Sequence, residues 1–410
     1  MKKLGIFLLF IMLVTGLFGQ QVVLNYYYNA IDRSIIELFE AQNPDIKINL
    51  VEMPENTNQK LQLIQTILFA KDSSMDLFDA DVTWAPIFSS AGWVAPLSKH
   101  FSDIELDAYL PGPLNSVTYN DEIWGIPYRT DAGILYYRKD LLEKYNKPVP
   151  ETWEELVETS KYIMVREPGM KGLSGSWAQF EGLTCNLMEI VWSYGGEVLD
   201  ENGKVIINSK ETLEALKMMD DMISKHRIMP DGIVNFYSGD ARAVFFAGNS
   251  VFLRDWPTGW LNSQNPSVSK IVGKVGISDL PKGDPMGRSY STLGGWQVMV
   301  SEYSKNKEAA IRFAKFRAGL QAQKIGAVNL SHIPALKSLY SDLDVLAKMP
   351  FIQDMYPAFY SAYPRPKSPY YAEISNILQT ETQMMFVGRK TPERALRDME
   401  FQIKMLLGQF

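Results

Sequence analysis

Hydrophobic and polar positions near the start of the chain follow two different periods. Stretches rich in β-favouring residues alternate with stretches that repeat apolar residues at helical spacing. In chain order these stretches are 22–28 (strand), 35–39 (helix), 46–50 (strand), 61–68 (helix) and 75–81 (strand). The first helical stretch stops at Asn43-Pro44, because proline cannot continue a helix. The order β-α-β-α-β predicts a parallel sheet covered by helices.

Start signals and turn signals predict further elements along the chain. Residues 134–137 form an apolar stretch typical of a strand, and Thr152 with Glu155 forms a capping box that starts a helix. Residues 202–203 (Asn-Gly) mark a hairpin turn, and residues 391–393 (Thr-Pro-Glu) start the last amphipathic helix. One continuous helical face is also expected, made of Ala309, Phe313, Phe316 and Leu320.

The end of the third predicted strand is a candidate position for a ligand. Ligands of open α/β sheets bind beyond the carboxyl ends of the strands. Asp81 ends this strand, and Trp84 follows it shortly afterwards. Both residues are therefore candidates for a binding site.

The chain length and its first residues suggest a secreted protein of two domains. Lys2 and Lys3 precede an uncharged apolar run that ends at Gly19. A basic start followed by a short apolar run is typical of a signal peptide, so residues 1–19 are assigned to one. The run is shorter than the ~20 residues that a permanent membrane anchor needs, although an anchor is the alternative. The remaining residues exceed what one core usually organises, which predicts two domains in a periplasmic protein.

Charge and cysteine content narrow the choice of partners. The net charge is −6, and loss of Lys2 and Lys3 makes it −8 (−6 minus 2). This mild acidity argues against nucleic acid or an anionic membrane as the partner. Cys185 is the only cysteine, so no internal disulfide is possible.

Most enzyme motifs are absent from the sequence. It contains no P-loop, no G-x-G-x-x-G and no H-E-x-x-H, and residues 172–176 lack the final glycine of a nucleophile elbow. His100, His226 and His332 stand far apart, which argues against a metal centre or a histidine-based triad. We therefore expect no cofactor, no metal and no catalytic residues. A glycoside hydrolase that works with carboxylates alone is still an open alternative, with Asp81, Asp131 and Glu181 available.

Aromatic and polar residues gather in three stretches rich in glycine and proline, at 254–260, 293–296 and 363–371. The faces of a pyranose are apolar C–H surfaces, and its rim carries hydroxyls. Trp and Tyr stack on such faces, whereas carboxylates and guanidinium groups bind the hydroxyls. These tryptophans could also be core residues, but their glycine-rich and proline-rich context favours a sugar site.

The chain resembles the extracellular solute-binding proteins of ABC sugar importers, in the trehalose/maltose-binding group, which is similar to maltose-binding protein. The motifs that carry the resemblance occur in the expected order at 79–84, 131–145, 150–156, 181–183, 255–257, 293–296 (Leu-Gly-Gly-Trp) and 364–366 (Pro-Arg-Pro). The resemblance implies the periplasmic binding protein fold, with two α/β lobes joined by a hinge of several strands. It also implies a monomer that is not an enzyme, binds sugar between the lobes and delivers it to the membrane permease.

The resemblance also assigns roles to single residues. It implies hydroxyl-binding carboxylates at Asp81 and Asp131, stacking platforms at Trp256 and Trp296, and a hydroxyl-binding cation at Arg365. Further candidate ligand-binding residues are Gly294 and Gly295, through their backbone, together with Trp84, Tyr371, Glu181, Arg129 and Thr258. The family often has aromatic residues at the positions of Arg129 and Thr258, and an acid where this chain has Ala30. A glucose-containing disaccharide such as maltose or trehalose is the first candidate ligand, and another glucoside or a monosaccharide stays open.

The expected division of the chain is discontinuous. Lobe one is predicted to comprise residues 20–129 and 297–333, and lobe two residues 130–296 and 334–410. We expect Asp81 and Trp256 to face each other across a cleft. A receptor for a non-sugar solute, such as a peptide or a polyamine, is a further alternative, but the aromatic motifs disfavour it.

Overall fold

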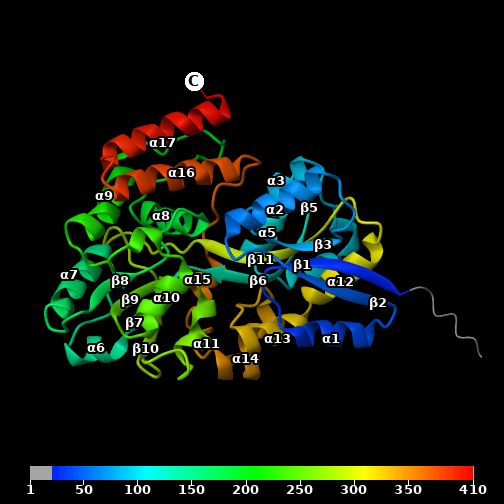
Figure 1. Ribbon diagram of the computed structural model, residues 1–410, viewed down its shortest axis with the longest axis horizontal. Coiled ribbons are helices and arrows are strands. Elements are labelled where there is room, and N and C mark those ends of the chain that lie inside the picture. Colours follow the sequence, from blue (N-terminus) through cyan, green and yellow to red (C-terminus); the bar gives the residue numbers. More distant parts are fainter. Residues whose placement is uncertain (1–20, 410) are drawn as a thin grey trace, which may run out of the picture.

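The computed structural model describes residues 21–409. The predicted signal peptide at 1–19 lies outside the described residues. The described chain forms two halves, each built on its own β-sheet (Figure 1). Within residues 21–409, no helix is long and apolar enough to cross a membrane.

The first half contains a five-stranded sheet with the order β2-β1-β3-β11-β6. Its strands are β1 (Val22–Tyr28), β2 (Ile46–Glu52), β3 (Leu77–Asp81), β6 (Ile126–Ala132) and β11 (Leu293–Val300). Strand β1 pairs in parallel with β2 and β3, so the predicted β-α-β-α-β start is confirmed. The connecting helices are α1 (Arg33–Gln42) and α2 (Thr57–Phe69), and α1 ends at the predicted Asn43. Strand β11 returns from far along the chain and pairs antiparallel with both β3 and β6.

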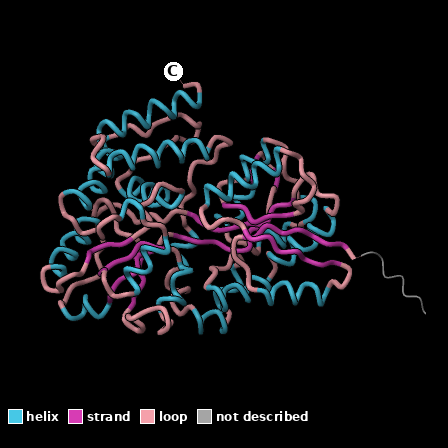
Figure 2. Tube along the Cα trace, in the orientation of Figure 1, coloured by secondary structure: helices cyan, strands magenta, loops and turns pink. Residues whose placement is uncertain are grey.

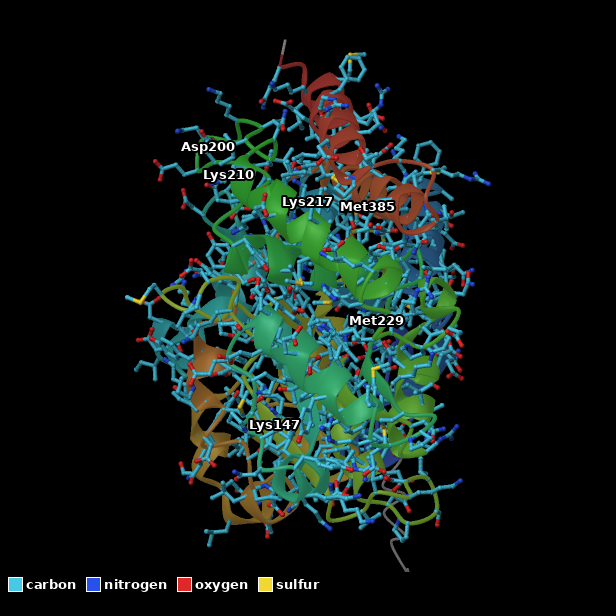
Figure 3. The ribbon with its side chains drawn as sticks, turned by 90° about the vertical axis from the view of Figure 1, so that its left-hand side faces the viewer. Lys147, Asp200, Lys210, Lys217, Met229 and Met385 are labelled. Atoms are coloured by element: carbon cyan, nitrogen blue, oxygen red, sulfur yellow. The ribbon has the colours of Figure 1, made fainter. Side chains whose placement is uncertain are left out.

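The second half contains a four-stranded sheet with the order β10-β7-β9-β8. Its strands are β7 (Ile134–Arg138), β8 (Lys171–Ser174), β9 (Ser250–Asp255) and β10 (Val275–Ser278). The larger helices of this half are α7 (Trp153–Met164), α8 (Glu181–Ser193), α9 (Lys210–Ser224), α10 (Ser238–Phe246), α16 (Tyr371–Phe386) and α17 (Pro392–Leu407). The predicted capping box of Thr152 and Glu155 starts α7, and Thr391 caps α17. Figure 3 shows this end of the molecule, where α9 packs beside α17.

Shorter elements complete the two halves, and helices cover both sheets (Figure 2). The remaining helices are α3 (Ala85–Ser90), α4 (Asp103–Asp107), α5 (Pro111–Val117), α6 (Lys139–Lys144), α11 (Trp260–Ser263), α12 (Lys307–Arg317), α13 (Leu320–Leu330), α14 (Leu343–Lys348) and α15 (Tyr356–Tyr360). A small hairpin is formed by β4 (Thr118–Tyr119) and β5 (Glu122–Ile123). Four short 3₁₀ helices are η1 (Ser98–His100), η2 (Ile233–Asn235), η3 (Pro257–Gly259) and η4 (Lys337–Ser341).

Within residues 21–409 the chain passes between the two halves in three places, and hydrogen bonds join these crossings. The first crossing lies at Gly133, between β6 and β7, and its carbonyl accepts a hydrogen bond from the Ser291 hydroxyl at 2.8 Å. The second crossing precedes β11, and the third follows α15. The Leu293 amide donates to the Tyr363 carbonyl at 2.8 Å, and the Tyr363 amide donates to the Ser291 carbonyl at 2.8 Å. The crossings therefore form one connected hinge region.

The lobe boundaries expected from the sequence stay a prediction. The boundary at 129/130 falls inside β6, and the boundary at 296/297 falls inside β11. Val345 and Phe359, which the sequence assigned to lobe two, belong to the hydrophobic cluster that includes the core of the first sheet.

Two local expectations differ from the structure. The helical face expected to reach Leu320 is interrupted, because α12 ends at Arg317 and the extended Gly319 starts a new helix. Leu320 is 53% exposed as a result. The turn at 202–203 forms, but its flanks make only the single bridge between Leu199 and Val205. The Val205 amide donates to the Gln409 side chain instead of extending a ladder.

Candidate functional site

A cavity of about 550 Å³ lies between the two halves. Strands β3, β6 and β11 of the first sheet supply one wall, and helices α8 and α10 with the segment after β9 supply the other. The predicted residues that line the cavity are Asp81, Arg129, Asp131, Glu181, Trp256, Thr258, Gly294, Gly295, Trp296 and Arg365. Asp81 and Trp256 thus lie on one cavity and come from different sheets, as expected.

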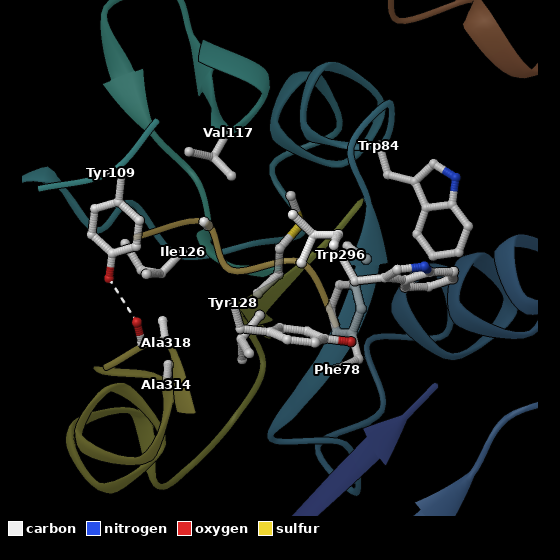
Figure 4. Close-up of a cluster of buried hydrophobic side chains, with 14 of the residues drawn as sticks. Phe78, Trp84, Tyr109, Val117, Ile126, Tyr128, Trp296, Ala314 and Ala318 are labelled. Atoms are coloured by element: carbon white, nitrogen blue, oxygen red, sulfur yellow. Dashed lines mark hydrogen bonds between the residues drawn. The ribbon is translucent and has the colours of Figure 1, made fainter. Parts of the chain in front are cut away.

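Trp84 and Tyr371 do not line the cavity but lie one layer behind it. The Trp84 ring is buried and meets Trp296 edge-on, with ring centroids 5.9 Å apart (Figure 4). The Tyr371 hydroxyl donates a hydrogen bond to the Glu181 carboxylate. Trp84 therefore supports Trp296, and Tyr371 supports Glu181. Their positions give no reason to expect that either residue contacts a ligand directly.

Arg365 joins carboxylates from both halves of the molecule. Its Nη2 lies 3.2 Å from Asp81 Oδ1, and its Nη1 pairs with Glu181 Oε1. The Glu181 carboxylate also accepts a hydrogen bond from Ser375 at 2.7 Å, and burial raises the pKa of this group. Because the guanidinium group faces both acids, Arg365 forms a direct link across the cavity.

Arg129 and Asp131 form a second charged pair on β6. Arg129 Nε lies 3.6 Å from Asp131 Oδ2, and both side chains are buried. In the described part of the chain, neither Arg129 Nε nor Asp131 Oδ1 has a hydrogen-bond partner. Burial raises the pKa of Asp131 to about 6, although the positive charges of Arg129 and Arg242 oppose the shift. Buried polar atoms are normally paired, so these two atoms are available to a bound polar ligand.

Two tryptophans give the cavity its apolar surfaces. Trp296 lies on β11, where it is 7% exposed, and Trp256 follows β9. The Arg254 guanidinium lies 4.3 Å from the centre of the Trp256 ring. A Cβ atom at position 294 would lie 2.7 Å from the Trp256 ring, which explains the glycine at this position. Gly295 has φ +131° and also lacks space for a Cβ, since that atom would lie 2.6 Å from the Arg129 carbonyl oxygen.

The helix N-termini that meet at the cavity were not predicted from the sequence. The additional lining residues are Glu55, Asn56, Thr57 and Gln59 at the start of α2, Phe180, Gly182 and Cys185 at the start of α8, and Tyr237, Ser238, Gly239 and Asp240 at the start of α10. Asn56 caps α2 through its side chain, so the helix start itself was readable from the sequence. The convergence of these three helix N-termini on one cavity could not be predicted from the sequence, because tertiary packing brings them together.

The cavity wall combines apolar ring faces with hydrogen-bonding groups of both kinds. Carboxylates accept hydrogen bonds, guanidinium groups donate them, and exposed helix N-termini offer backbone amides. The carboxylates of Glu55, Asp81, Asp131, Glu181 and Asp240 outnumber the guanidinium groups of Arg129 and Arg365. Among residues 21–409, no group of three or more His, Cys, Asp or Glu side chains could hold a metal ion. This wall offers matching surfaces to a molecule that carries both apolar faces and hydroxyl groups.

Comparisons with known proteins identify the family. The family described as bacterial extracellular solute-binding protein matches residues 24–324. A probable ABC transporter-binding protein of Deinococcus radiodurans is 34% identical over 372 residues, which cover 88% of this chain and 87% of that relative.

Solved structures agree with this assignment. The maltose-bound MalE3 of T. maritima has 36% sequence identity and a TM-score of 0.89, and the match covers 94% of this chain and 100% of that one. An ABC transporter solute-binding protein of Thermotoga lettingae TMO, bound to α-D-tagatose, has 25% identity and a TM-score of 0.82, with 94% and 100% covered. The two α/β lobes predicted from the sequence are therefore confirmed. The chain belongs to the family of bacterial extracellular solute-binding proteins.

Proposed function

We propose that this protein is the periplasmic sugar-binding component of an ABC importer and that it delivers its sugar to the membrane permease. The observation that carries the proposal is the composition of the 550 Å³ cavity. Trp256 and Trp296 approach it from different sheets, and carboxylates and arginines lie between them. A pyranose offers the matching surfaces, since its ring faces are apolar and its rim carries hydroxyls.

A glucose-containing disaccharide, maltose or trehalose, is the first candidate ligand. The cavity volume of about 550 Å³ lies within the ~300–1,000 Å³ range of sites for small molecules. The similarity to a maltose-bound protein supports maltose, and the similarity to a tagatose-bound protein keeps smaller sugars in the test panel. In this proposal, Arg129 Nε and Asp131 Oδ1, which have no hydrogen-bond partner among the described residues, bind the sugar: Arg129 Nε donates to a sugar oxygen and Asp131 Oδ1 accepts from a hydroxyl.

The proposed transport cycle requires the two lobes to move about the hinge. Lobe one would comprise residues 20–129 and 297–333, and lobe two residues 130–296 and 334–410. The protein would act as a monomer, closing around one sugar molecule without chemical change to it. Arg365 bridges Asp81 and Glu181 across the cavity, so it is suited to sense the distance between the lobes.

Hydrolysis of the sugar is the alternative that needs a separate test. A glycoside hydrolase would use two carboxyl groups, one of them protonated, on either side of the scissile bond. Asp81 and Glu181 both bind the guanidinium group of Arg365, so these two carboxyl groups hold each other's lobe through one arginine instead of standing free on either side of a scissile bond. Incubation with maltose, trehalose and chromogenic glucosides should therefore release no product.

A thermal-shift screen tests the proposed function. A ligand that binds only the folded state stabilises it by RT ln(1 + [L]/Kd), about 2.7 kcal/mol at a hundredfold excess over Kd. A panel of mono- and disaccharides should contain at least one sugar that raises Tm, while peptides, polyamines and nucleotides should not. A panel in which no sugar shifts Tm, or in which a polyamine does, would contradict the proposal.

A further inference from the structure

Lys60 occupies a position that is unfavourable for a cation. It lies in the first turn of α2 (Thr57–Phe69) and is only 5% exposed. The N-terminal end of a helix carries partial positive charge, which disfavours a cation there. None of the ion pairs among the described residues includes Lys60. Packing alone would be served better by an uncharged side chain, so the ammonium group calls for another explanation.

The Lys60 ammonium group makes two contacts. Its Nζ donates a hydrogen bond to the Glu55 carbonyl oxygen at 2.8 Å. It also lies 5.0 Å from the centre of the Trp296 ring, within the range of a cation–π interaction. Trp296 lines the cavity, whereas the buried Lys60 does not.

Few other polar interactions hold the Trp296 ring, although the residue packs in the hydrophobic cluster of the first half. Trp124, Trp153, Trp192 and Trp260 each donate a hydrogen bond from the indole nitrogen. In residues 21–409 the Trp296 indole has no such bond, and its aromatic neighbour is the edge-on Trp84 (Figure 4). Among the described residues, the cation–π contact with Lys60 is therefore the one polar interaction that fixes the Trp296 ring.

We propose that Lys60 is a positioning residue, which holds the Trp296 indole in place for stacking on the sugar. The proposal rests on the proposed function, because it assigns a role within the same binding site. The action is indirect, because Lys60 contacts the Trp296 ring but does not line the cavity that would hold the ligand.

The surroundings of Lys60 make this role sensitive to pH. Burial, and after it the charge of Arg129 on β6, lower the pKa of Lys60 to about 8. Asp79 and Asp81 on β3 and Glu55 in the preceding segment oppose the shift. If ligand binding needs the protonated ammonium group of Lys60, the affinity is highest below this pKa and falls as pH rises through it. Affinity should therefore be highest near pH 6.5 and lower above pH 9.

Calorimetric titration with maltose at pH 6.5, 8 and 9.5 tests the proposal. The wild type should lose about threefold to tenfold in affinity from the lowest pH to the highest, the size of a partly desolvated cation–π contact. Lys60→Met should bind with the lower affinity at every pH, whereas Lys60→Arg should keep the higher affinity throughout. In a Trp296→Leu background, Lys60→Met should have little further effect, because the ring it positions is gone. Lys147→Met is the matched control, since Lys147 lies 4.2 Å from the Tyr162 ring, outside the cavity.

A measurement without ligand separates this proposal from the proposed function. Emission of an indole responds to a charge beside it, so the difference between wild type and Trp296→Phe should change with pH with a midpoint near 8. That transition should be absent in Lys60→Met. If maltose fails to bind at any pH but the transition is present, the assignment of maltose fails and the contact of Lys60 with Trp296 stands. The positioning role is overturned if the transition is missing, or if Lys60→Met binds maltose with the wild-type affinity and pH dependence.

Discussion

Substitution of Asp131 by Asn should change binding and stability in opposite directions. Asp131 is 4% exposed and lies on β6 beside Arg129, and its Oδ1 atom has no hydrogen-bond partner in the described residues. Asparagine keeps the shape of the side chain and removes its charge. The substitution therefore isolates the contribution of the carboxylate charge to each property.

The stability effect follows from the pKa of Asp131, which burial raises from 3.8 to about 6. A carboxyl group with a raised pKa favours folding while it is protonated. That contribution is complete below pH 3.8 and is lost as pH rises through 6. Each pKa unit corresponds to about 1.4 kcal/mol, so the ionised group costs on the order of 1–3 kcal/mol above pH 7. Asp131→Asn removes this cost and should stabilise the ligand-free protein at pH 8, with little effect at pH 4.

The binding effect has the opposite sign. A hydrogen bond from a sugar hydroxyl to a carboxylate contributes about 1.5–3 kcal/mol. Loss of the charge should therefore weaken sugar binding about tenfold to a hundredfold. If the Asp131 carboxylate binds the sugar but destabilises the ligand-free protein, Asp131→Asn should weaken binding and raise stability together.

Urea unfolding at pH 4 and pH 8, with calorimetric titration of the sugar, measures both effects. Asp140→Asn is the matched control, because Asp140 pairs with Arg138 at 2.7 Å outside the cavity. Although burial raises the pKa of Asp140, the hydrogen bonds and charge of Arg138 lower it overall, so this substitution should destabilise the protein at pH 8 and leave binding unchanged. An Asp131→Asn protein that is less stable than wild type at pH 8, or that binds sugar normally, would refute the reasoning.

Three further predictions follow from the cavity wall. Trp256→Ala removes a stacking surface and should weaken sugar binding by at least about 2 kcal/mol in calorimetry, and unchanged affinity would remove Trp256 from the site. Arg365→Met leaves Asp81 and Glu181 unpaired and should lower the free energy of unfolding by about 3–5 kcal/mol at pH 7, so a loss below about 1 kcal/mol in urea titration would contradict the bridge. Tyr371→Phe removes one hydrogen bond to Glu181 and should lower stability by about 1 kcal/mol with less than a threefold change in affinity, whereas a large loss of affinity would mean that Tyr371 touches the ligand.

Local patterns predicted the elements whose signals are contained in a short stretch of sequence. The alternation of strand and helix periods up to Asp81 and the capping box at Thr152 were both confirmed. The break before Leu320 was missed, because the apolar spacing continues across Gly319 although the helix does not. The pairing of β11 with β3 was also not predictable, since the two strands are separated by about half of the chain.

In the candidate site too, the residues with a local sequence signal were predicted, whereas positions that depend on tertiary packing were not. Residues in glycine-rich and proline-rich stretches, such as Trp256 and Arg365, were found because their context is unusual for a core. Trp84 was expected at the surface of the site, but tertiary packing turns it behind Trp296. Tyr237, which is 44% exposed and lines the cavity, carried no local signal, because its role depends on where α10 begins in space.

A crystal structure of the protein with the sugar identified by the thermal-shift screen tests the central claim most directly. We expect one intact sugar molecule in the cavity between the lobes, with its ring faces on Trp256 and Trp296 and its hydroxyls within hydrogen-bond distance of Asp131 and Arg129. Electron density for a sugar elsewhere on the protein, for a cleaved product, or for an empty cavity at saturating sugar would contradict it.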